Sequence, residues 1–482
     1  MYDFFFQTSL GKQWKKIGLR KRSGVVFPLF SIYSQNSVGI GEFPDLKMAV
    51  DWCEITGNTI LQMLPLNDTG FQPSPFSPQT SIGLNPIHIS LSKLKKSIDS
   101  PVNPRVDYRI GPMKIEILRV IFRKGVELPK KFHDFTETNR DWLDDFSLFR
   151  ALKRYHAERP WKDWEERYRN RISIDDFSKD NSDEITFWKW VQWQAFEQLT
   201  DVKRYAESKN ILLKGDIPLF VSDDSSDCWV HKERFKMGFA TGTPPDDFSH
   251  EGQIWGMPPY NWEMMLDENL ESFRRRLAYA ENFYDLFKID HVVGLFRTWS
   301  VKVGSKSAIS GSFDINDPIE QKRRGEAILK SLTKKLNVLP CAEDLGTVPS
   351  FCRETLEKLG IPGLDVGRWQ KRYRHLAVST LSTHDMDLFP AWLESKGLGQ
   401  ENIEKGFEEI LSSPSIFSIN LLFDWLFLSK EIDARLASDY RINRPGINSE
   451  TNWSVRIPLS MEELLESPRN KIIEKAVKYH SR

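Results

Sequence analysis

Short runs of apolar residues alternate along this chain with segments that have the spacing of amphipathic helices. Apolar runs occupy residues 24–30, 59–64 and 211–221, and they are rich in Val, Ile, Leu and Phe. Helical spacing occurs at 44–56, after a turn with Gly39 and Gly41, and again at 320–335. Continuous apolar runs are typical of strands buried on both faces of a parallel sheet, and their alternation with helices indicates an α/β fold.

Three further apolar runs end in a carboxylate. They read LFKID at residues 286–290, VLPCAED at 338–344 and LAVSTLSTHD at 376–385. An acid at the carboxyl end of a buried strand lies at the rim of the sheet. In a closed barrel these rims meet at one mouth, where barrel enzymes carry out their chemistry. We therefore predict a (β/α)8 TIM-type barrel with helical and loop insertions at its C-terminal face.

Asp290, Glu343 and Asp385 are the acids that this arrangement would bring together. Three carboxylates at one mouth suit glycoside chemistry, in which one attacks the sugar, one transfers protons and one holds the ring. Taken singly, each acid is as readily a helix cap or an ion-pair member, and a neighbouring histidine is as readily structural. The repeated position after a strand, with His291 and His384 beside two of the acids, favours the catalytic interpretation.

Two segments interrupt the alternation of strands and helices. Residues 91–199 are charged, Trp-rich and patterned as helices, and we interpret them as a helical insertion subdomain that emerges from one barrel loop. Residues 241–262 are rich in Pro, Gly and aromatic residues without periodicity, so we expect an active-site loop there. We see no repeat or linker that separates a further domain, and residues 1–482 are expected to form a single catalytic barrel domain.

Charge and cysteine content exclude several classes of function. The 67 basic residues balance the 67 acidic ones, so the chain has no net field for nucleic acid or an anionic membrane. The four cysteines have no metal-ligand spacing, and the sequence lacks a P-loop, a GxGxxG dinucleotide motif, an HExxH zinc motif and a GxSxG elbow. We expect no cofactor, no metal, no membrane span and a cytoplasmic location.

The chain resembles the 4-α-glucanotransferase family, also called amylomaltases or disproportionating enzymes, which are relatives of the α-amylase barrels. The similarity runs nearly end to end. The long 241–262 segment and the string AEDLG at 342–346 are specific to this family among amylase-like barrels. The other matching motifs are LPL at 64–66, SPF at 74–76, NP at 85–86, GDIP at 215–218, DSSD at 224–227, IDH at 289–291, GIPG at 360–363, STHD at 382–385 and NW at 452–453.

The resemblance implies a role for each of the three acids. Asp290 matches the nucleophile that forms a β-linked glucosyl-enzyme, Glu343 matches the general acid/base, and Asp385 matches the acid that binds and distorts the sugar ring. Because Glu343 must be protonated when it donates to the leaving oxygen, we expect its pKa to be raised relative to that of Asp290.

The resemblance also implies a set of residues that contact the sugar chains. His291 and His384 match side chains that bind sugar hydroxyls, and three residues of the 241–262 segment match the lining of the acceptor side. Asn452 and its neighbour Trp453 are expected to close the far wall. The implied substrate-binding set is Ser74, Phe76, Asp246, Gln253, Trp255, Lys288, His291, His384 and Asn452.

Two of these positions depart from the family. This chain has Lys288 where the family has Arg two residues before the nucleophile, and it has Phe76 where the family has Tyr. Lysine keeps the positive charge, so that Asp290 can stay ionised, but a compact ammonium positions a carboxylate less tightly than a planar guanidinium. Phenylalanine keeps a face for stacking and loses the hydroxyl. We therefore expect a working but slower enzyme.

The expected activity is transfer of α-1,4-glucan segments by a retaining double displacement, with maltooligosaccharides and α-glucans as donors and acceptors. Water and a sugar hydroxyl can both attack the same intermediate, so an α-glucan hydrolase is an alternative. The departures at Lys288 and Phe76 leave a catalytically weakened glucan-binding protein as a second alternative. We expect a monomer or a weak homo-oligomer.

Overall fold

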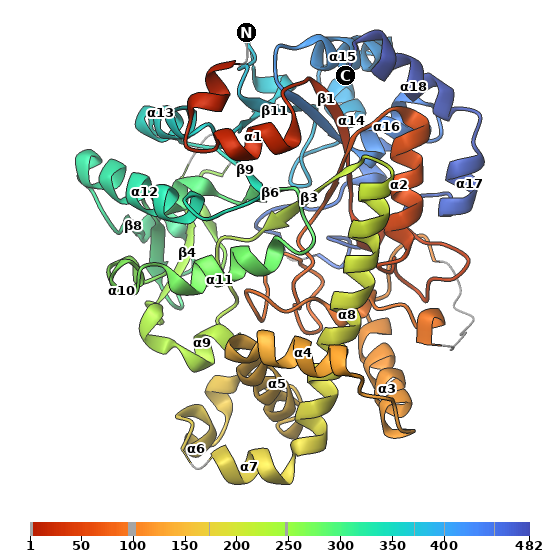
Figure 1. Ribbon diagram of the computed structural model, residues 1–482. Coiled ribbons are helices and arrows are strands. Elements are labelled where there is room, and N and C mark those ends of the chain that lie inside the picture. Colours follow the sequence, from red (N-terminus) through yellow and green to blue (C-terminus); the bar gives the residue numbers. More distant parts are fainter. Residues whose placement is uncertain are drawn as a thin grey trace.

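Eight parallel strands form a barrel at the centre of the molecule (Figure 1). The computed structural model describes residues 3–94, 103–172, 174–245, 249–370, 372–399, 401–447 and 449–482. The strands, in order of neighbours, are β1 (Arg22–Phe27), β2 (Ile60–Met63), β3 (Leu212–Ile217), β6 (Leu286–Ile289), β9 (Leu339–Ala342), β10 (Gly363–Val366), β11 (Ala377–Thr380) and β12 (Phe417–Leu421). The Ala342 N–H donates to the Pro362 carbonyl at 2.7 Å, which joins β9 to the chain entering β10. The predicted TIM-type barrel is confirmed.

The acid-tipped runs form β6, β9 and β11, as predicted, but two other strands do not follow from the hydrophobic pattern. β10 contains Asp365, a buried carboxylate that accepts from the Arg374 N–H at 2.7 Å and from its Nε at 2.8 Å. β12 contains Asn420, whose buried Oδ1 accepts from the Leu381 N–H at 2.9 Å. Polar residues can occupy these strands because each has a partner inside the protein. β1 ends at Phe27, since the next residue is a proline and has no N–H for the ladder.

Helices cover the outside of the barrel. The helices predicted at 44–56 and 320–335 are α2 (Asp45–Thr56) and α12 (Pro318–Thr333). α2 ends at Gly57, whose φ of 77° favours glycine, and α12 begins after Asp317, whose side chain accepts from the Ile319 N–H. The remaining helices outside the β2–β3 connection are α1 (Gly11–Ile17), α9 (Ser226–Val230), α10 (Trp262–Asp267), α11 (Glu271–Ala280), α13 (Ser350–Leu359), α14 (Phe389–Ser395), α15 (Glu401–Ser412), α16 (Leu422–Leu428), α17 (Met461–Glu466) and α18 (Asn470–Tyr479).

A group of helices connects β2 to β3, and α4 to α7 lie at the end of the molecule away from the two marked termini (Figure 1). The group consists of α3 (Ile110–Arg123), α4 (Lys130–Thr138), α5 (Arg140–Tyr155), α6 (Glu166–Arg169), α7 (Ile174–Asp180) and α8 (Ser182–Ser208). The Gln192 side chain of α8 exchanges two hydrogen bonds of 2.8 Å with the backbone of Leu84, so this helix is fixed to the loop that follows β2. Across the described ranges, no helix combines the length and apolar character needed to cross a membrane.

A small antiparallel sheet lies beside the barrel. It consists of β5 (Gln253–Ile254), β4 (Phe239–Thr243), β7 (Trp299–Lys302) and β8 (Ser312–Phe313), in that order. Residues of β4 and all of β5 belong to the 241–262 segment, so strand pairing orders part of a segment whose composition indicates only a loop. Gly242 allows the close approach of these two strands, because a Cβ at this position would lie 1.9 Å from the Gln253 carbonyl oxygen.

Candidate active site

A cleft with a volume of about 880 Å³ opens at the carboxyl ends of the barrel strands. Its walls come from the loops after the strands and from the small antiparallel sheet. Lys288 lies beneath the floor of the cleft, and Asp246 falls outside the described residues. The other predicted site residues all line the cleft, and they are Ser74, Phe76, Gln253, Trp255, Asp290, His291, Glu343, His384, Asp385 and Asn452.

The three acids are held at the rim of the barrel. Asp290 directly follows β6 and Glu343 directly follows β9. Their N–H groups donate to the carbonyls of Ile217 and Ile289 at 3.2 and 3.0 Å, which continues the parallel ladder by one residue. Asp385 lies in the loop after β11. The side chains of the three acids are 22%, 20% and 40% exposed, respectively, so each is open to the cleft.

Lys288 joins the acids from below. Its ammonium lies 3.0 Å from Asp216 Oδ2, 3.2 Å from Asp290 Oδ1 and 2.5 Å from Glu343 Oε2. Because Asp290 and Glu343 contact the same nitrogen, these two oxygens lie less than about 6 Å apart, as a retaining pair of carboxyl groups requires. The strand register explains the contact, since Lys288 pairs with Asp216 on β3 and with Cys341 on β9.

One ammonium among three carboxylates cannot neutralise all of them. Burial, together with the negative charges of Glu343 and Asp216, raises the pKa of Asp290 well above its ordinary value, although Lys288 opposes this. Burial also acts to raise the pKa of Glu343, but the nearer Lys288 ammonium and the His384 ring outweigh it and lower this pKa. The predicted order, with Asp290 ionised and the higher pKa on Glu343, is therefore wrong for the free enzyme.

Asp385 is held by an amide and an imidazole. Asn443 Nδ2 donates to Asp385 Oδ1 at 2.7 Å, and His384 Nε2 lies 3.3 Å from Asp385 Oδ2. Burial alone would raise the pKa of Asp385, but His384, Asn443 and Lys288 lower it to about 2. This carboxylate is therefore ionised at neutral pH and can accept hydrogen bonds from sugar hydroxyls.

Aromatic rings pack around His384. Phe76 stacks on it, with ring centroids 4.6 Å apart and planes inclined by 15°. Trp453 is tilted against both rings. The Lys288 ammonium lies 5.3 Å from the centre of the Phe76 ring, within the range of a cation–π interaction. Phe76 therefore uses one face to position His384, in addition to lining the cleft.

Two bulky residues of the cleft have left-handed backbones, His291 with φ of 43° and Trp453 with φ of 59°. Such conformations cost about 1–3 kcal/mol and cluster at functional sites. The His291 ring meets Trp255 edge to face with centroids 4.8 Å apart, and burial lowers the pKa of His291 to about 4, so the ring is neutral at pH 7. The Trp453 carbonyl accepts from the Tyr108 hydroxyl at 2.7 Å, which ties this residue to the segment that precedes α3.

Two predicted sugar-contacting residues hydrogen-bond within their own loops. Asn452 Nδ2 donates to the Ile447 carbonyl at 2.8 Å, and Asn452 Oδ1 accepts from the Arg444 N–H at 3.1 Å. Gln253 Oε1 accepts from Trp255 Nε1 at 3.1 Å. These bonds fix the shape of the cleft wall.

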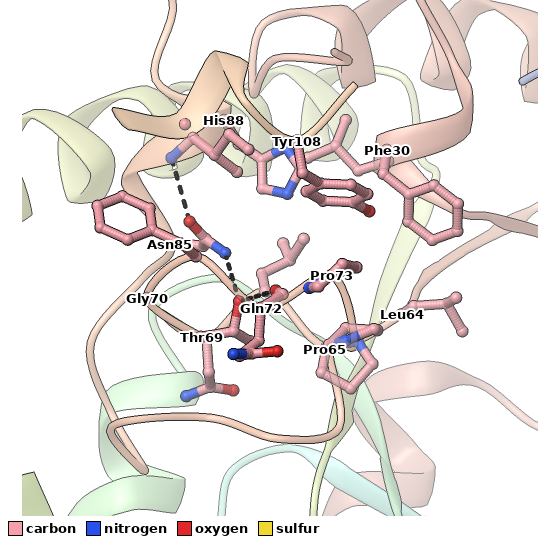
Figure 2. A pocket seen from close by; sticks show the side chains of 17 residues that line it. Phe30, Leu64, Pro65, Thr69, Gly70, Gln72, Pro73, Asn85, His88 and Tyr108 are labelled. Atoms are coloured by element: carbon pink, nitrogen blue, oxygen red, sulfur yellow. Dashed lines mark hydrogen bonds between the residues drawn. The ribbon is translucent and has the colours of Figure 1, made fainter. Parts of the chain in front are cut away.

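A smaller pocket of about 30 Å³ lies behind the loop that carries Ser74 and Phe76 (Figure 2). Asn85 Nδ2 donates to Thr69 Oγ1 at 3.3 Å, and Thr69 Oγ1 donates to the Gln72 carbonyl at 2.7 Å. Gln72 lines both this pocket and the cleft. The chain of hydrogen bonds in Figure 2 therefore supports the loop from the side away from the cleft.

Sequence reasoning missed two polar residues of the site. The signal for Asp216 is present, because it is a further acid in the middle of an apolar run, 211–221. Asn443 lies in a segment without periodicity, so no local pattern indicates that it reaches Asp385. Its place depends on how the loop after β12 folds back over the barrel.

Comparisons with known proteins agree with this geometry. A family model described as 4-alpha-glucanotransferase matches residues 27–461. The 4-alpha-glucanotransferases of Chlamydia caviae and Chlamydia trachomatis are 34% and 35% identical to this chain, with 95% and 97% of both chains covered. An amylomaltase from Streptococcus agalactiae, solved in complex with acarbose, has the same fold, with a TM-score of 0.83 at 23% identity over 96% of this chain and 100% of that one.

Proposed function

The chain belongs to the 4-alpha-glucanotransferase family, and we propose that Asp290, Glu343 and Asp385 carry out its reaction by a retaining double displacement on maltooligosaccharides and α-glucans. Membership of the family makes it a 4-alpha-glucanotransferase. The observation that supports the residue roles best is the contact of Asp290 and Glu343 with one ammonium, beside Asp385 in the same cleft.

The first displacement forms a covalent intermediate. The Asp290 carboxylate attacks the anomeric carbon, and a β-glucosyl ester forms as the bond to the glycosidic oxygen breaks. Glu343 gives its proton to that leaving oxygen. Asp385, which is ionised, accepts hydrogen bonds from ring hydroxyls and holds the distorted sugar, and the neutral ring of His291 and the imidazole of His384 bind further hydroxyls.

The second displacement transfers the sugar. A 4-hydroxyl of the acceptor attacks the anomeric carbon, Glu343 takes its proton, and the ester bond breaks to restore Asp290. Each proton that Glu343 gives in the first step therefore returns to it in the second. The product keeps the α configuration, because the anomeric carbon is inverted twice.

Transfer requires that a sugar hydroxyl, rather than water, reaches the intermediate. Trp255, Phe76 and Trp453 give the cleft apolar faces on which a glucosyl ring can stack, and a bound acceptor excludes water from the anomeric carbon. Asp246, Gln253 and Trp255 of the 241–262 segment are proposed to line the acceptor side, and Ser74 and Asn452 the opposite parts of the cleft.

Incubation with maltotriose tests the function. A ladder of longer oligomers together with glucose is the expected product pattern, whereas shorter sugars alone would indicate a hydrolase and unchanged maltotriose a binding protein. Asp290→Asn must abolish turnover, and Asp433→Asn, in an exposed ion pair with Arg435, serves as the matched control. Turnover by the Asp290→Asn enzyme would overturn the assignment of the nucleophile.

A cytoplasmic location and a monomeric or weakly associated state belong to the same proposal. The four cysteines are buried and free, which suits a reducing compartment. Light scattering at two protein concentrations tests the oligomeric state, since a weak homo-oligomer would increase in mass with concentration.

A further inference from the structure

A second cavity lies inside the barrel, directly beneath the cleft. We call it the inner chamber. Its volume is about 40 Å³, and one water molecule needs only about 10–15 Å³ by this measure. Glu343, Thr383 and His384 line both the chamber and the cleft, so these three residues separate the two spaces. The polar wall of the chamber also includes Lys214, Gln62 and Cys341.

Lys214 is a buried lysine that the proposed mechanism does not use. It is 2% exposed and shares the inner face of β3 with Asp216, two residues further on. Its ammonium donates to Gln62 Oε1 at 2.6 Å, and Gln62 is its neighbour in the register of β2 and β3. In the described part of the chain, this is the one hydrogen bond of the ammonium, and no carboxylate lies within 4 Å of it.

An ammonium has three N–H donors, and Gln62 takes one of them. The polar chamber provides room for water that accepts from the others. Burial lowers the pKa of Lys214, while Cys341, Asp216 and Glu343 act in the opposite direction. A lysine at this depth without a carboxylate partner is costly, so a purely structural role would be served better by an apolar side chain.

We propose that Lys214 is a positioning residue of the transfer reaction, whose ammonium, together with water in the inner chamber, places a second positive charge beneath the Glu343 carboxylate. This inference rests on the proposed role of Glu343 as acid/base. Such a charge is useful here, because among the described residues Lys288 is the one ammonium within 4 Å of the carboxylates of Asp216, Asp290 and Glu343. Lys214 compensates part of this negative excess from a position that the substrate does not reach.

The charge state of Glu343 depends on every group packed around it. Lys288 and Lys214 approach from β6 and β3 on the side of the barrel interior, and the other groups lie at the rim or on its own strand. The titratable groups that face it are Asp216 and Lys214 from β3, Lys288 from β6, Asp290 and His291 after β6, Cys341 from β9, and His384 and Asp385 after β11.

The test is the pH profile of kcat/KM with maltotriose for Lys214→Met. Loss of a positive charge favours the protonated form of nearby carboxyls, so both limbs of the bell-shaped profile should move to higher pH, by about one unit. Gln62→Glu should move them in the same direction, because its carboxylate would neutralise the Lys214 charge. Lys214→Arg keeps the charge and should leave both limbs in place.

Three results would overturn the inference. One is a Lys214→Met enzyme with lower kcat and unmoved limbs, which would indicate packing alone. Another is an equal shift in Lys214→Arg. If Lys214→Met does not fold, thermal unfolding will reveal it. In that case, a Gln62→Glu enzyme whose pH profile of kcat/KM has both limbs in their original places decides against the proposal. Turnover by Asp290→Asn would instead contradict the proposed function, so the two failures are distinguishable.

Discussion

Replacing Lys288 by Met removes the positive charge that Asp216, Asp290 and Glu343 share. At an effective dielectric constant of about 20, a unit charge 3.2 Å from Asp290 Oδ1 interacts with it by about 5 kcal/mol. Removing one partner of a buried ion pair lowers the free energy of unfolding by about 3–5 kcal/mol. Each 1.4 kcal/mol is about a factor of ten in rate, so losing about 3–4 kcal/mol of the interaction that keeps Asp290 ionised should lower kcat/KM of Lys288→Met by at least about 10²–10³-fold.

The same change alters how stability depends on pH. Without the ammonium, the already raised pKa values of Asp216 and Asp290 rise further in the folded state, and the pKa of Glu343 rises from its lowered value. A group with a raised folded-state pKa stabilises the fold below its unfolded-state pKa, of about 4, and this contribution is lost as the pH rises through the folded value. Lys288→Met should therefore lose more unfolding free energy, relative to the original protein, at pH 8 than at pH 5.

Urea unfolding at both pH values and kinetics on maltotriose check these outcomes. Lys288→Arg is the matched control, because it keeps the charge and restores the planar fork that the family has at this position. It should preserve or raise turnover. A Lys288→Met enzyme that retains more than about a tenth of kcat/KM would refute the reasoning, since a tenfold change in rate corresponds to only ~1.4 kcal/mol. A large loss in Lys288→Arg would show that the site has adapted around lysine.

Substitutions at three further positions probe the surroundings of the acids. Phe76→Tyr restores a hydroxyl at the cleft, and one additional hydrogen bond of about 0.5–1.5 kcal/mol should raise kcat/KM by about 2–10-fold in steady-state assays. Asn443→Ala removes the donor to Asp385, and kcat/KM should fall by about 10–100-fold. Asn443→Asp places a second carboxylate beside Asp385, and kcat/KM should fall further than in Asn443→Ala. His291→Gln should lower kcat/KM without moving either limb of the pH profile, because the pKa of His291 is about 4 and its ring is neutral at the working pH; a moved limb would show that His291 titrates.

The barrel could be predicted where the strands are apolar and short turns separate them from helices. β6, β9 and β11 follow from their apolar runs, and the positions of Asp290 and Glu343 follow from the ends of β6 and β9, whereas β11 ends at Thr380 and Asp385 lies in the loop after it. β10 and β12 could not be predicted, because Asp365 and Asn420 break the apolar pattern and are tolerated only through partners from elsewhere in the chain, Arg374 and Leu381. Their strand character is a tertiary effect.

The acids of the site follow from local pattern together with the family resemblance, but their charges do not. The register of β3, β6 and β9, together with the conformation of the flexible Lys288 side chain, decides which carboxylate the ammonium approaches most closely. The sequence places Lys288 two residues before Asp290, so it predicts support for that acid. In the folded barrel the shorter contact is to Glu343, on the neighbouring strand, and this contact reverses the predicted order of the two pKa values.

The contact of Lys288 with Glu343 has opposite consequences for the two proposed displacements. In the first, Glu343 must carry the proton and Asp290 must be ionised, so the proton has to pass to Glu343 and the ammonium has to turn toward Asp290. A bound glycosidic oxygen favours this exchange, because it accepts a hydrogen bond from protonated Glu343. In the second, Asp290 is esterified and Glu343 acts as a base, which is the state that the shorter Lys288 contact stabilises. A guanidinium can donate to both carboxylates at once and needs no such movement. The lysine should therefore slow formation of the glucosyl-enzyme and leave its transfer to the acceptor largely unaffected.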